Sequence, residues 1–176
     1  GHDDLIIPDT GSPSRRHEPF GGSLRYPERG MTEKERYLFD LQGYLLIEDA
    51  IPAGALPELD RILGEQALKS GPPDTPACTL KKIVAWGQPF LDVADNPRIR
   101  PYLEEICGHN YRLDHDYAFV RRAINGKASP GGAMHLGCTP FHPACWYQWR
   151  DGRPQSGLTT ISYLLTDVPP GAGGFC

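Results

Sequence analysis

Long hydrophobic runs are missing from this chain of 176 residues. The longest purely apolar stretches, such as Leu45-Leu46-Ile47, span only a few residues, whereas a helix needs about 20 to cross a bilayer. The first residues also lack the apolar segment that is typical of a secretory signal. We therefore expect a soluble, cytoplasmic protein with no membrane partner.

An excess of positive charge is also missing. The 18 Lys and Arg residues are outnumbered by 22 Asp and Glu residues, which gives a formal net charge of −4. Basic residues are interspersed with acidic ones, and the adjacent basic pairs are Arg15-Arg16, Lys81-Lys82 and Arg121-Arg122. Because nucleic-acid-binding domains gather basic residues on one face, this composition argues against a nucleic-acid partner.

A pattern of paired cysteines is the third absence. The five cysteines are an odd number and are widely spaced, at Cys78, Cys107, Cys138, Cys145 and Cys176. In a chain without a secretory signal, we expect these to be reduced thiols. With 39% hydrophobic residues the chain can bury one core, so a single domain is expected.

The composition changes near residue 30. Residues 1–30 hold four prolines and a polar cluster at 10–16, and they show no hydrophobic periodicity. We therefore expect an irregular or disordered N-terminal arm. Its apolar anchor Leu5-Ile6-Ile7 leaves open that the arm packs across the domain. Residues 31–176 carry the periodic patterns and form the expected domain.

Helix signals come first in that domain. Thr32 and Glu35 are spaced as a capping box, and Gly43 is placed to end the helix that follows. Hydrophobic residues recur at steps of three and four along residues 56–67, which predicts an amphipathic helix that ends at Gly71. A helical turn is expected at residues 88–94 and another helix at residues 97–107.

Strand signals dominate the second half. β-Branched and aromatic residues predict strands at residues 44–47, 81–86, 112–124, 133–136 and 158–165. A long aromatic-rich excursion separates the last two, over residues 139–154. Because helices precede most of the strands, we expect an α+β fold in which N-terminal helices pack on an antiparallel barrel or sandwich.

Three stretches together carry a family resemblance. They are residues 39–47 (Phe-Asp-Leu-Gln-Gly-Tyr-Leu-Leu-Ile), His135 leaving a strand-like segment, and residues 158–175, where a β-branched run closes in a Pro- and Gly-rich turn. In this order and spacing they resemble the phytanoyl-CoA dioxygenase family, from about Met31 to Cys176. The resemblance implies N-terminal helices packed on a partial double-stranded β-helix of the jelly-roll, cupin-like kind.

The resemblance also implies a function, that of an Fe(II)- and 2-oxoglutarate-dependent dioxygenase which hydroxylates its substrate. His135 would be the proximal iron ligand, and Tyr163 falls where relatives place an aromatic side chain against 2-oxoglutarate. Two histidines and a carboxylate hold such an iron on one face and leave positions open for the keto acid and dioxygen. The distal histidine and a keto-acid-binding arginine would follow Cys176.

The family pattern is broken at one position. The carboxylate expected two residues after His135 is replaced by Gly137. Three interpretations stay open. In the first, the third ligand comes from water, from Asp151 or from a residue beyond Cys176. In the second, a halide ion occupies the space, as in iron halogenases of related fold. In the third, iron binding has been lost.

Aromatic and cationic residues gather in the excursion after His135. They are Phe141, Trp146, Tyr147, Trp149, Arg150 and Arg153. Rings and guanidinium groups together favour a small, partly apolar substrate that carries an anionic group. The cluster could line a substrate entrance or pack as a lid over the barrel mouth.

Alternative uses of the same residue types also stay open. A structural, tetrahedral zinc site would suit the pair spacings of His135, Cys138, His142 and Cys145. A truncated barrel could instead be a non-catalytic binding or scaffold protein, and strand edges exposed after Leu165 would then favour homo-oligomers. His115, between Asp114 and Asp116, is interpreted as part of a solvated charge cluster.

Overall fold

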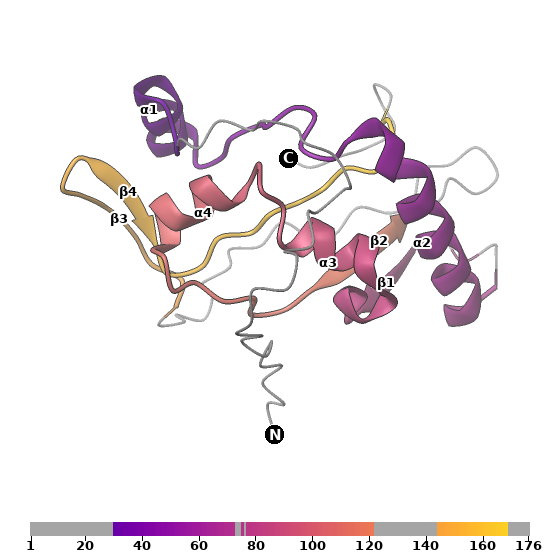
Figure 1. The fold of residues 1–176 in the computed structure, drawn as a ribbon. Coiled ribbons are helices and arrows are strands. Elements are labelled where there is room, and N and C mark those ends of the chain that lie inside the picture. Colours follow the sequence, from indigo (N-terminus) through magenta and orange to yellow (C-terminus); the bar gives the residue numbers. More distant parts are fainter. Residues whose placement is uncertain (1–29, 73–74, 76, 122–143, 169–176) are drawn as a thin grey trace, which may run out of the picture.

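The computed structural model describes residues 30–72, 75, 77–121 and 144–168 (Figure 1). Helices make up most of the first part of these residues, and three of the four strands follow the last helix. In order, the elements are α1 (Glu33–Gln42), the 3-10 helix η2 (Ala53–Ala55), α2 (Leu56–Ser70), β1 (Ala77–Lys81), the 3-10 helix η3 (Ile83–Trp86), α3 (Gln88–Ala94), α4 (Arg100–Cys107), β2 (Tyr117–Arg121), β3 (Tyr147–Arg150) and β4 (Arg153–Ser156).

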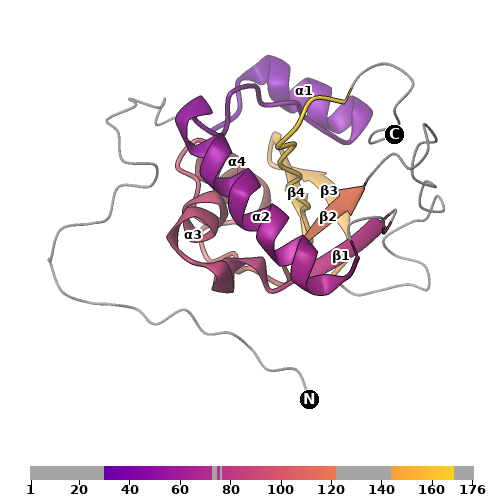
Figure 2. The same cartoon turned by 90° about the vertical axis from the view of Figure 1, so that its right-hand side faces the viewer.

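The apolar core lies where α2 meets α3. α2 buries Leu59, Ile62 and Ala67, and the first two pack with Phe90 and Val93 of α3. Steps of three and four residues place the α2 positions on one side of the helix, as the sequence predicts. Figure 2 shows α2 passing in front of β1 and β2, with α3 beside it.

β1 and β2 pair as an antiparallel, two-stranded sheet. The register aligns Lys81 with Tyr117 and Leu80 with Ala118. Leu80 is buried, and Ala118 and Val120 are half-buried on the same face of the sheet. Because α2 packs on β1, this face joins the core and the opposite face is left exposed.

α1 is built by local signals rather than by burial. Thr32 Oγ1 accepts a hydrogen bond from the Glu35 amide at 3.2 Å, and Glu35 Oε2 accepts from the Thr32 amide at 2.7 Å. This geometry confirms the capping box. Gly43 ends the helix with a left-handed φ of 79°, also as predicted. The helix buries none of its residues.

Polar contacts join α1 to α4. The Arg36 guanidinium pairs with Glu105 of α4, and Glu105 Oε2 also accepts from the Met31 amide at 2.8 Å. A second bond runs from the Tyr102 hydroxyl to Glu35 Oε1 at 3.0 Å. The position of α1 therefore depends on charged and hydrogen-bonded groups, most of them partly buried.

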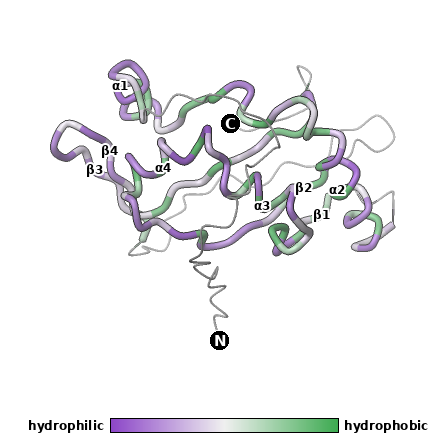
Figure 3. The backbone as a smooth tube through the Cα atoms, in the orientation of Figure 1, coloured by the Kyte–Doolittle hydropathy of each residue, from purple (hydrophilic) through white to green (hydrophobic). Residues whose placement is uncertain are grey.

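β3 and β4 form a tight hairpin that contacts α1. Asp151 and Gly152 at its turn have φ values of 53° and 74°, which match the right-handed twist of paired strands. Tyr147 donates to Asp40 Oδ1 at 2.6 Å and meets the Phe39 ring edge-on, with ring centroids 6.2 Å apart. Figure 3 colours most of this hairpin as hydrophilic.

Two predicted strands are absent from the ladders of the described residues. Residues 44–47 and residues 158–165 belong to neither sheet. Apolar and β-branched side chains favour an extended chain, but a strand also needs a neighbouring backbone to accept its hydrogen bonds. In this part of the chain neither segment has such a neighbour, and Leu46 is 75% exposed.

Two further boundaries were predicted wrongly. The strand expected at residues 81–86 ends at Lys81, because Lys82 takes a left-handed φ of 59° and the chain turns into η3. The helix expected from Pro97 begins at Arg100. Asn96 accounts for the later start of α4, because its buried side chain accepts a hydrogen bond from the Arg98 amide at 2.9 Å and so stabilises a turn before the helix.

The α+β class is confirmed at the level of mixed helices and small antiparallel sheets. The helical turn at residues 88–94 is confirmed as α3, and the strand predicted at 112–124 is found over Tyr117–Arg121. The arm before Gly30 and the strand predicted at 133–136 lie outside the described residues. No helix among the described residues is long and apolar enough to cross a membrane.

Candidate functional site

The exposed face of the β1–β2 sheet is the first candidate site. Strand alternation places Lys81, Tyr117, Phe119 and Arg121 on this face, and all four are exposed. β1 contributes the short Thr79 opposite Phe119. A face that is neither buried nor purely charged is chemically suited to contact a ligand that has both a ring and a charge.

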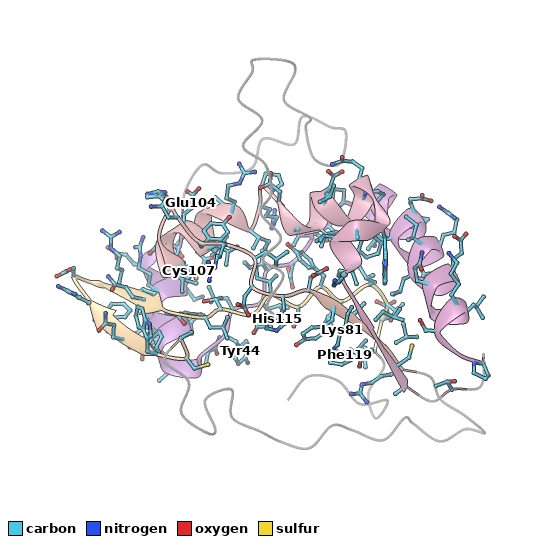
Figure 4. The ribbon with its side chains drawn as sticks, turned by 90° about the horizontal axis from the view of Figure 1, so that it is seen from below. Tyr44, Lys81, Glu104, Cys107, His115 and Phe119 are labelled. Atoms are coloured by element: carbon cyan, nitrogen blue, oxygen red, sulfur yellow. The ribbon has the colours of Figure 1, made fainter. Side chains whose placement is uncertain are left out.

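Contacts between neighbouring side chains organise this face into a row. The His115 ring stacks on Tyr117, with centroids 5.5 Å apart and planes 16° apart. Tyr117 meets Phe119 edge-on at 4.9 Å, and the Arg121 guanidinium lies over Phe119, 5.6 Å from its centroid. Figure 4 shows Lys81, His115 and Phe119 along these strands, away from Glu104 and Cys107 of α4. We call His115, Tyr117, Phe119 and Arg121 the aromatic row.

The acidic neighbours of His115 have two different roles. Asp114 is exposed, and its Oδ2 lies 2.6 Å from His115 Nδ1, which agrees with a solvated pair. Asp116 is half-buried instead, and its Oδ2 accepts from the Val84 amide at 2.8 Å. The interpretation as a solvated cluster is therefore wrong for Asp116, which fastens the start of β2 to η3.

Tyr163, the predicted 2-oxoglutarate contact, is half-buried against the apolar core. Its hydroxyl donates to the Val93 carbonyl at 3.0 Å. Burial raises the pKa of the Tyr163 phenol above its usual range. The phenol is therefore held neutral and fixed in direction, and the ring packs against the apolar core.

The aromatic cluster after His135 is partly described. Trp146, Tyr147 and Trp149 are exposed on or next to β3, whereas Phe141 lies outside the described residues. Partial burial and the hydrogen bond to Asp40 raise the pKa of Tyr147 to about 12. Through Tyr147 the hairpin therefore packs on α1, and its exposed tryptophans do not enclose a pocket within the described part of the chain.

A polar cavity of about 390 Å³ lies between α1, α4 and the hairpin turn. Its charged lining residues are Arg36, Glu104, Glu105, His109, Asp151 and Arg153. Several of these charges already compensate one another, as in the Arg36 to Glu105 pair and the 3.6 Å approach of His109 Nδ1 to Glu104. The cavity therefore has the character of an ion-pair interface between elements.

The predicted metal ligands fall mostly outside the described residues. These include His135, Cys138 and His142, and Gly137, which stands where the family has a carboxylate ligand, lies outside them too. Cys145 is described and half-buried, and Asp151, the alternative third ligand, is exposed at the hairpin turn beside Arg150. Within the described ranges no group of three or more His, Cys, Asp or Glu side chains is arranged to hold a metal ion.

Comparison with known proteins adds no relative: no family model, no curated protein and no solved structure matches the chain. The candidate site therefore depends on the residues themselves. Sequence reasoning used Tyr117 and Phe119 only as strand formers and overlooked the aromatic row. The signal that could have revealed it is the alternation of His, Tyr, Phe and Arg at every second position from His115 to Arg121.

Proposed function

We propose that this chain belongs to an Fe(II)- and 2-oxoglutarate-dependent dioxygenase of the jelly-roll, cupin-like kind, which hydroxylates a small, partly apolar anion. The proposal starts from the resemblance of residues 39–47, His135 and residues 158–175 to the phytanoyl-CoA dioxygenase family. With iron bound, one dioxygen would be the oxidant for both reactions, the decarboxylation of 2-oxoglutarate and the hydroxylation of a substrate C–H bond.

The observation that carries the proposal is the course of residues 157–168. This segment runs extended across the molecule in Figure 1. Tyr163 and Leu165 pack on the helical core, whereas Leu164 between them is 65% exposed. Alternation of this kind is expected of a barrel strand that has helices on one side and further strands to pair with.

The roles of the residues follow from this placement. His135 would bind the metal, and Tyr163 would present its ring beside the keto acid while Val93 holds its hydroxyl. The fit of iron depends on His135 and its neighbours, which lie outside the described residues.

Anaerobic titration with Fe(II) and 2-oxoglutarate tests the proposal in the full natural chain that contains these residues. Binding of both is expected to give a visible metal-to-ligand charge-transfer band. His135→Ala should abolish the band, whereas His109→Ala should preserve it because His109 is an exposed side chain beside Glu104. A band that is missing in the parent chain, or that survives His135→Ala, would overturn the assignment.

A binding or scaffold protein is the second candidate function. It is favoured by the apolar side chains that residues 157–168 expose without a ladder partner among the described residues, including Ile161, Leu164 and Val168. Such a segment can pair with a second copy of the chain. Sedimentation should then show a dimer that Leu164→Lys dissociates, and a folded monomer at high concentration would exclude it.

A further inference from the structure

We infer that the exposed face of the β1–β2 sheet binds a planar aromatic anion, a ring that carries a carboxylate or a similar group. This binding surface does not depend on iron or on 2-oxoglutarate, so it goes beyond the proposed dioxygenase activity. It is defined by the aromatic row together with Lys81 and Thr79.

Exposure of the rings is the first argument. Tyr117 is 40% and Phe119 is 52% exposed, although large aromatic side chains are usually among the more buried residues. Residues on the opposite face of the same strands, such as Leu80, are buried against the helical core. The sheet therefore satisfies its packing on one side and presents two rings on the other.

The shape of the face is the second argument. Thr79 lies opposite Phe119 and Ala77 lies opposite Arg121 in the ladder. Because directly paired side chains share a face, these short neighbours leave the Phe119 ring accessible from the β1 side. A flat ring can lie in that space against Phe119 and extend toward Tyr117, with the edge-on or offset geometry that aromatic pairs prefer.

Charge completes the specification of the ligand. Lys81 faces Tyr117 across the ladder, and Arg121 lies over Phe119 at the other end of the row. Asp114 Oδ2 lies 2.6 Å from His115 Nδ1, at the Tyr117 end of the row. Two cations at the ends of a pair of rings complement a ligand that carries its negative charge at the edge of a ring.

A single small anion fits these observations better than a nucleic acid. The whole chain has a net charge of −4, and within the paired residues of β1 and β2 the cationic side chains on this face are Lys81 and Arg121. A polyanion would need a longer basic track along its backbone. The face is therefore suited to a ligand with one ring and one anionic group.

Equilibrium dialysis with 2-naphthoate, in metal-free buffer with a chelator, tests the inference. Two analogues separate the contributions: 2-naphthamide keeps the ring without the charge, and cyclohexanecarboxylate keeps the charge without the flat ring. We expect saturable binding of one 2-naphthoate per chain, and both analogues should bind about tenfold more weakly. Equal binding of all three would overturn the inference.

Variants locate the binding. Phe119→Leu and Arg121→Gln should each weaken 2-naphthoate binding by about fivefold, and unchanged circular dichroism would show that the chain is still folded. Tyr37→Leu is the matched control, because Tyr37 is 64% exposed on α1 and lies outside the row. If Tyr37→Leu weakens binding as much as Phe119→Leu, the site is not on this sheet. Failure of the iron titration would leave these results untouched.

Discussion

The two ends of the molecule differ in the balance of apolar and polar contacts that hold them together. At one end, α2, α3 and the β1–β2 sheet enclose an apolar cluster centred on Leu59. At the other end, where Met31, Ile106 and Pro154 are buried as well, α1 also contacts α4 and the β3–β4 hairpin through ion pairs and hydrogen bonds, and Glu105 pairs with Arg36. Figure 1 shows the two groups at opposite ends of the structure.

This difference separates what burial does from what polar contacts do. Apolar burial is non-directional and contributes most of the free energy of folding, whereas hydrogen bonds and ion pairs contribute less but fix direction. The apolar end should therefore set global stability. The polar end should set where α1 and the hairpin lie, and it should be the first part to respond to pH and salt.

The largest effect is expected from the apolar end. Leu59 is fully buried, so Leu59→Ala removes packed methyl groups and leaves a cavity, which should lower the free energy of unfolding by about 2–5 kcal/mol. Leu68→Ala is the control on the same helix, since Leu68 is 59% exposed. Urea denaturation followed by far-UV circular dichroism measures both. Equal losses in the two variants would show that burial of Leu59 does not set the global stability.

A smaller loss is expected at the polar end. Glu105→Gln weakens the pairing with Arg36 and the bond from the Met31 amide, both partly buried, and should cost about 2 kcal/mol. Hydrogen bonding to Glu105 also raises the pKa of Arg36 above its usual value. The control is Glu58→Gln in the exposed pair with Arg61, where almost no change is expected.

Hydrogen exchange distinguishes a local effect of Glu105→Gln from a global one. If the polar end is a separate unit, the variant should speed exchange of α1 amides while α2 amides keep their protection. Equal acceleration in α1 and α2 would show that the two ends unfold together. The apolar and polar ends would then differ in their contacts but would unfold as one cooperative unit.

The same contrast explains which parts of the fold can be read from the sequence. α1 and α2 are encoded locally, by the Thr32 capping box, by Gly43 and by apolar spacing, and their bounds were predicted closely. Residues 44–47 and 158–165 have strand-like composition but form no ladder among the described residues. Strand formation depends on a distant partner backbone, and composition alone does not supply one.

The candidate site was predictable to a smaller extent. Tyr163 was singled out, but its bond to the Val93 carbonyl joins residues 70 positions apart and has no local signal. The aromatic row was visible as alternation, yet whether it faced solvent or core depended on which side of β1 met α2. Sequence pattern therefore identifies faces, and packing decides which of them is exposed.

A third prediction concerns the capping box at the polar end. Thr32→Ala removes the acceptor of the Glu35 amide and should destabilise α1 by about 1 kcal/mol. Ser70→Ala at the far end of α2 is the control, because the Ser70 hydroxyl bonds only within its own last turn. Amide exchange of α1 measures the effect, and an equal loss in the control would contradict it.

The Thr32 prediction also has a pH dependence with a definite sign. Partial burial raises the pKa of Glu35, but hydrogen bonds from Thr32 and Tyr102 and the charge of Arg36 outweigh it, so the pKa lies below its usual value. A lowered pKa adds stability above the unfolded value, about 4.3, and this is lost as pH falls through the folded value. The difference in the stability of α1 between the parent and Thr32→Ala should therefore become smaller on acidification below about pH 4.

The smallest effect is expected where the hairpin meets α1. Tyr147→Phe keeps the ring against Phe39 and removes only the donor to Asp40, so the loss should be about 0.5 kcal/mol at neutral pH. Tyr37→Phe on the exposed surface of α1 is the matched control and should change nothing. Thermal unfolding at matched ionic strength measures both variants.

Alkaline pH tests the bond from Tyr147 to Asp40 in a second way, because the pKa of Tyr147 is raised to about 12 by partial burial and by Asp40. A raised pKa contributes stability that is fully present below the unfolded value, near 10, and is lost as pH rises through the folded value. The difference in the free energy of unfolding between the parent and Tyr147→Phe should therefore become smaller between about pH 10 and pH 12. A difference that stays constant over that range would mean that Asp40 does not hold the phenol, and that the hairpin docks on α1 through ring packing alone.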